Sequence, residues 1–298
     1  MAALTRDLKY GGMATLSLSA CFAAGVGAGG SLFFPDLLGG TEVTIGNLRG
    51  TAFVVLVLGV PLLLAGLAST RRGSARGAAM LLGAHAYLLY QGVLFCFATP
   101  FNALFLSYVA MLGLALWSLI ALFLQLDVTE VARQVHPAMP YRAASVTLAL
   151  VVIVNWLVWM ARVVPATVAE QPSDLLEGSG LLTSPVYVQD LAFWLPAGLV
   201  VAALTWSRTT WGALLATGLL TFYVVEVLSV ASDQWWGARA DDSHPDLASM
   251  SVVPAAILLA AVIAIPAALC LRRLGPQPAE GTTPPSSANF SSAAGVAT

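Results

Sequence analysis

Residues 211–232 read WGALLATGLLTFYVVEVLSVAS, and Glu226 is the one charged residue among them. A helix needs about 20 mostly apolar residues to cross the hydrocarbon core of a bilayer. Other stretches meet or nearly meet this condition, so the sequence predicts an all-α, polytopic transmembrane bundle of about eight helices. The other predicted spans are 11–33, 51–69, 77–98, 101–125, 144–164, 190–206 and 251–271.

The composition of the whole chain supports this prediction. Of its 298 residues, 58% are hydrophobic and only 9% are charged, and the mean hydropathy is +0.84. A soluble domain carries about 25% charged residues, so the surface of this chain is predicted to face a lipid bilayer rather than water. The net charge of −2 predicts no nucleic-acid partner. The three cysteines lie far apart in apolar runs, which predicts no disulfide framework and no metal site.

The basic residues predict the orientation of the spans, because cytoplasmic loops carry an excess of Lys and Arg. With the N-terminus placed inside, ten of the 13 basic residues fall on the inner side and three on the outer side. This asymmetry predicts an even number of spans, with both termini in the cytoplasm. The inner residues are Arg6, Lys9, Arg71, Arg72, Arg76, Arg133, Arg142, Arg208, Arg272 and Arg273, and the outer ones are Arg49, Arg162 and Arg239.

Comparison of the chain with itself indicates an internal repeat. At an offset of 135 residues, the hairpin of the second and third spans resembles the hairpin of the sixth and seventh. Both hairpins start outside, so the repeat is parallel and predicts two four-helix halves, 1–125 and 144–274, related by a pseudo-twofold axis along the membrane normal. The matched pairs are Pro61 and Pro196, Gly77 and Gly212, Ala78 and Ala213, Gly83 and Gly218, Tyr87 and Phe222, and Gln91 and Glu226.

Residues 126–143 are predicted to form a cytoplasmic connector between the halves. Asp127, followed three residues later by Glu130, resembles a capping box. We therefore expect a short helix on the inner membrane surface that ends before Pro137. Residues 275–298 are rich in Pro, Ser and Ala and nearly uncharged, which predicts a disordered cytoplasmic tail.

Polar side chains inside the predicted spans are the candidates for function, because polar groups in lipid usually face the protein interior or a water-filled cavity. Glu226 is the one carboxylate well inside a predicted span. It is a candidate proton-coupling group, cation ligand or general acid/base. The alternative is a structural hydrogen bond or ion pair to another helix.

Further polar candidates share the outer half of the membrane with Glu226 in the predicted orientation. Three of them form one face of the third span, and the others lie where the second, fourth and sixth spans open. They predict a polar pocket that opens outward, with Arg49 and Asp190 as a candidate ion pair or ligand contact. For the tyrosines, ordinary packing with a satisfied hydroxyl is an equal alternative. These candidates are Tyr87, Tyr90, Gln91, Asn102, Arg49 and Asp190.

Several different short motifs lie along the spans. They are Arg49-Gly50, Gly59-Val60-Pro61, Arg71-Arg72-Gly73-Ser74, Tyr87 with Tyr90, Phe101-Asn102-Ala103-Leu104-Phe105 with Tyr108, Gln189-Asp190-Leu191 with Pro196, and Trp211-Gly212. Together they resemble a group of uncharacterised bacterial multi-pass membrane proteins, over residues from about Leu8 to Leu271. The resemblance implies the architecture and no activity, cofactor or site residue, since the group has no established activity. Gln91 departs from the Asn that this pattern favours, and the lysine-poor composition suits an actinobacterial source.

Three functions from different classes fit the sequence. The first is a transporter or permease for a small molecule or ion, with an outward-facing polar site. The second is a non-catalytic membrane subunit or scaffold, in a homo-oligomer or with a membrane partner. The third is a membrane-embedded enzyme that acts on a lipid-like substrate, which is disfavoured because the chain has no HExxH, GxSxG or Walker lysine motif. No catalytic residue or metal ligand is predicted, and the sequence leaves the cofactor unknown.

Overall fold

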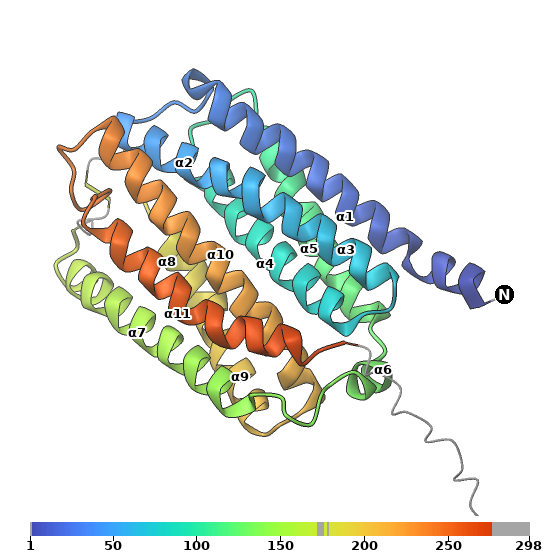
Figure 1. Cartoon of the computed structure of the whole chain (residues 1–298). Coiled ribbons are helices and arrows are strands. Elements are labelled where there is room, and N and C mark those ends of the chain that lie inside the picture. The colour runs from blue at the N-terminus through green and yellow to red at the C-terminus, as the bar shows by residue number, and fades with distance from the viewer. Residues whose placement is uncertain (1, 172–175, 178, 276–298) are drawn as a thin grey trace, which may run out of the picture.

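The computed structural model describes residues 2–171, 176–177 and 179–275, with side chains from Gly11 onward. Its described residues contain no β-strand, and an isolated bridge joins Val135 to Leu274. Eight of the helices are long and apolar enough to cross a membrane. They run beside one another as one bundle (Figure 1). These features confirm the all-α, eight-span fold, and the chain is an integral membrane protein.

Two of the spans are interrupted by a turn of π-helix, and these turns carry the labels η2 and η3. A 3-10 turn, η1 (Pro35–Leu37), follows the first span. The spans are α1 (Ala2–Phe33), α2–η2–α3 (Glu42–Val54, Val55–Gly59, Val60–Arg71), α4 (Ala75–Phe97), α5 (Phe105–Gln125), α7 (Tyr141–Val168), α8–η3–α9 (Pro185–Gln189, Asp190–Trp194, Leu195–Trp206), α10 (Thr210–Ala240) and α11 (Val252–Arg272).

Several spans are longer than their apolar stretches predict. The second begins at Glu42 rather than near 51, and the sixth begins at Pro185 rather than near 190. At both starts a hydroxyl caps the helix: Thr41 accepts from the backbone N–H of Thr44, and Ser184 does so from Tyr187. Such caps satisfy free N–H groups, so the helix continues into polar sequence that a hydropathy window excludes.

Both ends of the described chain lie at one end of the bundle. The start of α1, the short helix α6 (Val128–Arg133) and the end of α11 share that end (Figure 1). An even number of spans requires this arrangement. The assignment of this end to the cytoplasm rests on the basic residues alone and stays a prediction. Beyond Gly275, the predicted tail lies outside the described residues.

The connector between the halves contains the predicted short helix. The Asp127 carboxylate accepts hydrogen bonds from the N–H groups of Thr129 and Glu130, at 3.0 and 3.2 Å. This cap confirms the start predicted from the sequence. After α6, the Gln134 side chain donates to the carbonyl of Gly73 at 2.8 Å and accepts from the N–H of Ala75 at 2.8 Å. Gln134 thereby ties the connector to the turn between α3 and α4.

Helix boundaries in the two halves coincide at the offset seen in the sequence. The turns η2 and η3 start 135 residues apart, as do α3 and α9, and α1 and α7 end with the same separation. The caps match too: Ser74 accepts from the N–H of Gly77, and Thr209 accepts from that of Gly212. The last spans of the two halves, α5 and α11, do not share the offset. The duplication of whole halves therefore stays a prediction.

The helices α4 and α10 cross at a glycine pair. A Cβ atom on Gly83 would lie 2.6 Å from the carbonyl oxygen of Gly218, and one on Gly218 would lie 3.1 Å from that of Ala79. Small residues allow such close approach between membrane helices. Because Gly83 and Gly218 are counterparts in the repeat, the crossing joins equivalent points of the two hairpins.

Candidate functional site

Glu226 and Gln91 form the centre of the polar cluster. The Gln91 Nε2 atom donates to Glu226 Oε2 at 2.6 Å, from α4 to α10. Gln91 is only 1% exposed, and Glu226 is partly buried. These two residues are also counterparts at the offset of 135, like the glycines of the crossing about two turns away. The structure thus brings together two residues that the sequence selected separately.

Tyr87 lies on the same face of α4. Its hydroxyl donates to the Ser229 Oγ atom on α10 at 3.2 Å, and its side chain is fully buried. The carboxyl group of Glu226 lies within electrostatic range of this hydroxyl. Tyr87 therefore joins the cluster, with its own hydrogen bond satisfied by the neighbouring helix.

Asp190 carries the second carboxyl group of the cluster, and it is 5% exposed. Its Oδ2 atom accepts a hydrogen bond from Trp159 Nε1 at 2.7 Å and a longer one from Asn155 Nδ2 at 3.4 Å, both on α7. Tyr90, on α4, also hydrogen-bonds to this carboxyl group. Asp190 therefore links α7, η3 and α4 through neutral donors.

A π-helical turn carries Asp190. Asp190 is the first residue of η3, and Pro196 follows at the second position of α9. Proline has no N–H to donate to the carbonyl four residues before it, so the regular α-helical ladder cannot continue through this point. Single π-turns inside helices occur frequently at functional sites. The turn η2 precedes Pro61 in the same way in the other half.

Aromatic rings pack against one another in the same region. Trp194 stacks on Phe222 with the ring centroids 4.8 Å apart, and Tyr90 lies 5.9 Å from Trp194 and 5.8 Å from Phe222. On the α7 side, Trp159 and Tyr187 meet edge to face at 5.0 Å. Two of these aromatic residues, Trp159 and Tyr90, hydrogen-bond to Asp190.

One part of the cluster differs between the two halves of the repeat. Four of its residues in the second half have apolar counterparts in the first half at the same offset, whereas Glu226 has the polar counterpart Gln91. These four polar and aromatic side chains are thus specific to the second half. The pairs are Asn155 with Ala20, Trp159 with Ala24, Asp190 with Val55, and Trp194 with Gly59.

No cation neutralises these carboxyl groups within the described part of the chain. Glu226 lies within electrostatic range of two other acids, Asp190 and Asp233. The described ion pair of the chain, Arg133 with Glu130, lies on α6 instead. A charge buried without a partner is costly, so a charged state here requires a bound cation, and a neutral state requires a bound proton.

Arg49 does not pair with Asp190. Its guanidinium lies over the ring of Trp236 on α10, 4.7 Å from the centroid. The described residues contain no ion pair between Arg49 and Asp190. Gly46 and Gly50 explain the position, because they let α2 approach the backbone of α10 at Trp236 and Asp233. Arg49 thus contributes a cation–π contact between α2 and α10.

Asn102 is not part of the cluster either. Its Oδ1 atom accepts from the N–H of Leu104 at 2.8 Å, and its Nδ2 atom donates to the carbonyl of Pro100 at 3.1 Å. Asn side chains commonly bond to the backbone two residues away in this manner. The residue therefore organises the start of α5. His85 likewise makes a helix-to-helix contact, with Ser17 of α1 at 2.9 Å.

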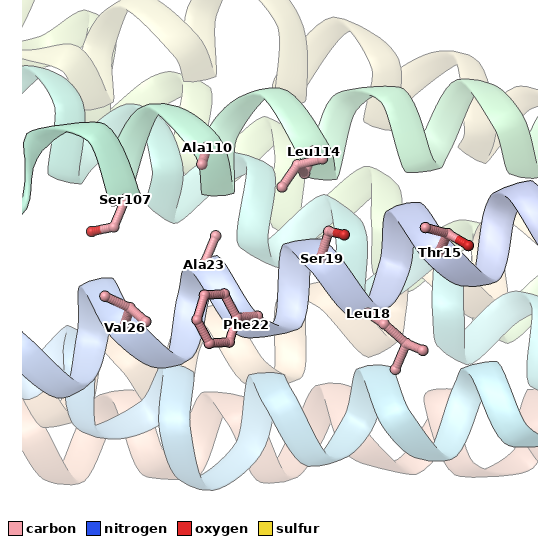
Figure 2. Close-up of a pocket in the computed structure, with 9 residues that line it drawn as sticks. All are labelled: Thr15, Leu18, Ser19, Phe22, Ala23, Val26, Ser107, Ala110 and Leu114. Atoms are coloured by element: carbon pink, nitrogen blue, oxygen red, sulfur yellow. The ribbon is translucent and has the colours of Figure 1, made fainter.

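A groove of about 510 Å³ lies between α1 and α5 (Figure 2). Thr15, Ser19 and Ser107 contribute hydroxyl groups, and the rest of its lining is apolar. None of the candidate residues lines it. The described residues also contain no group of three or more His, Cys, Asp or Glu that could hold a metal ion. The groove and the polar cluster are thus separate features.

Sequence reasoning did not assign the partners of Asp190. Trp159 and Trp194 have the positions expected of tryptophans at the membrane interface, so the sequence did not indicate a role in the cluster. No sequence pattern distinguished Tyr223 or Asp233. A comparison of the two halves at the offset of 135 residues could have indicated Asn155, Trp159 and Trp194. These residues stand where the first half has small apolar ones.

Comparison with protein-family models, curated proteins and solved structures gives no match. The class of the protein therefore follows from its own fold and site. It is an eight-span helical membrane protein with interrupted second and sixth spans and a buried carboxyl cluster between α4, α7, η3 and α10.

Proposed function

We propose that the protein is a transporter or permease for a small molecule or ion, with Glu226 as the group that binds the coupling proton or cation. The observation that carries this proposal is the contact between Gln91 and Glu226 at 2.6 Å, in a cluster of acids without a described cationic partner. A carboxyl group in this setting changes its energy strongly when a proton or cation binds or leaves. That property is what coupling requires.

The interrupted helices support the same function. Transporters built from repeats bind their substrates near the middle of the membrane, beside discontinuous helices in corresponding positions of the two halves. Here η2 and η3 occupy corresponding positions, each is followed by a proline, and η3 carries Asp190. A scaffold does not need two matched interruptions.

A small hydrophobic cluster lies at the end of the bundle that carries α6. Val131 of α6 packs with Ala75 and Ala78 of α4 and with Leu214 of α10. In the predicted orientation this cluster lies at the cytoplasmic end, while Asp190 lies near the outer end of its span. We infer that the structure represents a state closed toward the cytoplasm, in a bacterial plasma membrane with both termini inside.

The test records charge movement in proteoliposomes on a solid-supported membrane after a jump in pH or in Na⁺ concentration. We expect a transient current in the wild type and its loss in Glu226→Gln, which keeps the shape of the side chain and removes its charge. Glu42→Gln is the matched control, because Glu42 is exposed at the start of α2. An identical current in Glu226→Gln would contradict the coupling role. A silent wild type under both jumps would favour the scaffold.

A further inference from the structure

We propose that Asp190 and Glu226, with the rings around them, form a binding site for an organic ammonium ion. This inference rests on the proposed transport function and names its substrate class. The first step is the charge of the site, which two acids supply and no described basic side chain balances. An ammonium ion is the complementary organic ligand.

The second step is the pattern of unused hydrogen-bonding atoms. Gln91 Oε1 and Tyr223 Oη are buried and have no described partner, and these side chains are 1% and 6% exposed. Gln91 Nε2 is bound to Glu226, so its oxygen remains free beside that carboxyl group. A ligand with N–H donors satisfies such acceptors. The unpaired donor Gln189 Nε2 is available to an oxygen atom of the same ligand.

The third step is the aromatic enclosure. Trp194 lies one turn beyond Asp190 in η3, and Phe222 lies one turn before Glu226 in α10. The rings of Trp194 and Phe222 stack on each other at 4.8 Å, and Tyr90 lies against both. The faces of such rings attract ammonium groups. The ligand is therefore expected to lie against these ring faces, with its ammonium group beside the acids.

The asymmetry of the two halves supports a ligand rather than a structural role. At the offset of 135, Val55 and Gly59 stand where Asp190 and Trp194 do, and the first half keeps the same turn with no polar group. The fold of the interrupted span thus does not depend on an acid or a tryptophan at these positions.

The test uses the full chain in nanodiscs of phosphatidylglycerol, a lipid without an amine, and follows the melting midpoint with added ethanolammonium. Ethylene glycol and glycolate are matched probes that carry a hydroxyl or a carboxylate in place of the ammonium. A ligand that binds only the folded protein raises its melting midpoint. We expect a saturable rise with ethanolammonium alone. Equal shifts from all three probes, or no shift from any, would overturn the proposal.

Variants locate the site. We expect Asp190→Asn to raise the apparent Kd for ethanolammonium about tenfold or more, because a charge-assisted contact is lost. Trp194→Leu is expected to raise this apparent Kd about three- to tenfold, because an aromatic face is lost. Trp156→Leu is the matched control, since Trp156 lies on α7 and is 48% exposed on the outside of the bundle. Wild-type affinity in Asp190→Asn would overturn the assignment.

A second arm separates the two sources of the ammonium group. With phosphatidylethanolamine added to the nanodiscs, a weaker apparent affinity for ethanolammonium identifies a lipid headgroup as the natural ligand, and an unchanged affinity identifies a free amine. Both results support the ammonium site. If ethanolammonium does not bind while the charge movement still depends on Glu226, the ammonium site is wrong and the transport function stands.

Discussion

Gln91 and Glu226 lie 135 residues apart in the chain, occupy equivalent positions in two similar hairpins, and meet in a hydrogen bond of 2.6 Å. Two equivalent residues can touch only where the two hairpins meet. The glycine pair of the crossing, Gly83 and Gly218, obeys the same relationship. The polar centre of the molecule therefore lies on the contact between its two similar parts.

The energy of this hydrogen bond can be measured with a double-mutant cycle. We expect Gln91→Ala and Glu226→Ala to show a coupling of about 0.6–1.7 kcal/mol, the range found for hydrogen bonds between membrane helices. The measurement is equilibrium unfolding in mixed micelles. A coupling near zero would show that the contact contributes nothing to the association of α4 with α10.

The crossing itself should tolerate no side chain. Gly83→Ala places a methyl group 2.6 Å from the Gly218 carbonyl oxygen, so the helices must separate. We expect a destabilisation of about 1–3 kcal/mol. Gly113→Ala on α5 is the control, because a Cβ atom there meets nothing within 4 Å. The measurement is the midpoint of thermal unfolding of both variants. Equal midpoints would contradict the close approach of α4 and α10 at Gly83.

The connector is expected to control access from its end of the bundle. Gln134→Ala removes the contacts to Gly73 and Ala75, each of which contributes about 1 kcal/mol. Cys270 is fully buried near this end. In a background with Cys21 and Cys96 replaced by Ser, we expect Gln134→Ala to raise maleimide labelling of Cys270 about fivefold or more.

The control for this labelling experiment is Arg133→Ala. It breaks the exposed ion pair with Glu130 and leaves the Gln134 contacts intact. A labelling rate that rises equally in both variants would assign the effect to a general loosening of α6.

The orientation in the membrane can be tested with single cysteines. Ser207 lies in the turn between α9 and α10, and Ser243 follows α10 at the opposite end. In intact bacteria, we expect an impermeant maleimide to label Ser243→Cys and to spare Ser207→Cys, in accordance with the predicted topology. The reverse labelling pattern would show that the orientation is opposite to the predicted one, with the polar cluster in the inner half of the membrane.

The sequence was sufficient to predict the spans because each needs only length and apolarity. Three of the residues that it selected, Glu226, Gln91 and Tyr87, lie close together in the structure, since polar groups in lipid turn toward each other. Their role as a functional site stays a prediction. The interruptions at η2 and η3 were not predicted. An apolar run continues through η2, η3 coincides with the start of the predicted sixth span, and only Pro61 and Pro196 indicate the turns.

The remaining candidates show where sequence reasoning fails for such a protein. The hydropathy pattern placed Arg49 and Asp190 at the openings of the second and sixth spans, yet Arg49 stacks on Trp236 and Asp190 binds Trp159. Helices that are apolar on all sides carry no signal for their rotation about their own axes. The partners of a polar residue therefore depend on packing that hydropathy does not encode, as also for Asn102, whose side chain bonds to the local backbone.

The most direct test of the central claim is mass spectrometry of the gently purified protein for bound small molecules. If the cluster around Glu226 is a binding site, a ligand should be present in the wild type and in Glu42→Gln and absent from Glu226→Gln. The absence of any ligand from all three proteins, with equal thermal stability, would contradict the account and indicate that the Gln91–Glu226 contact only joins α4 to α10.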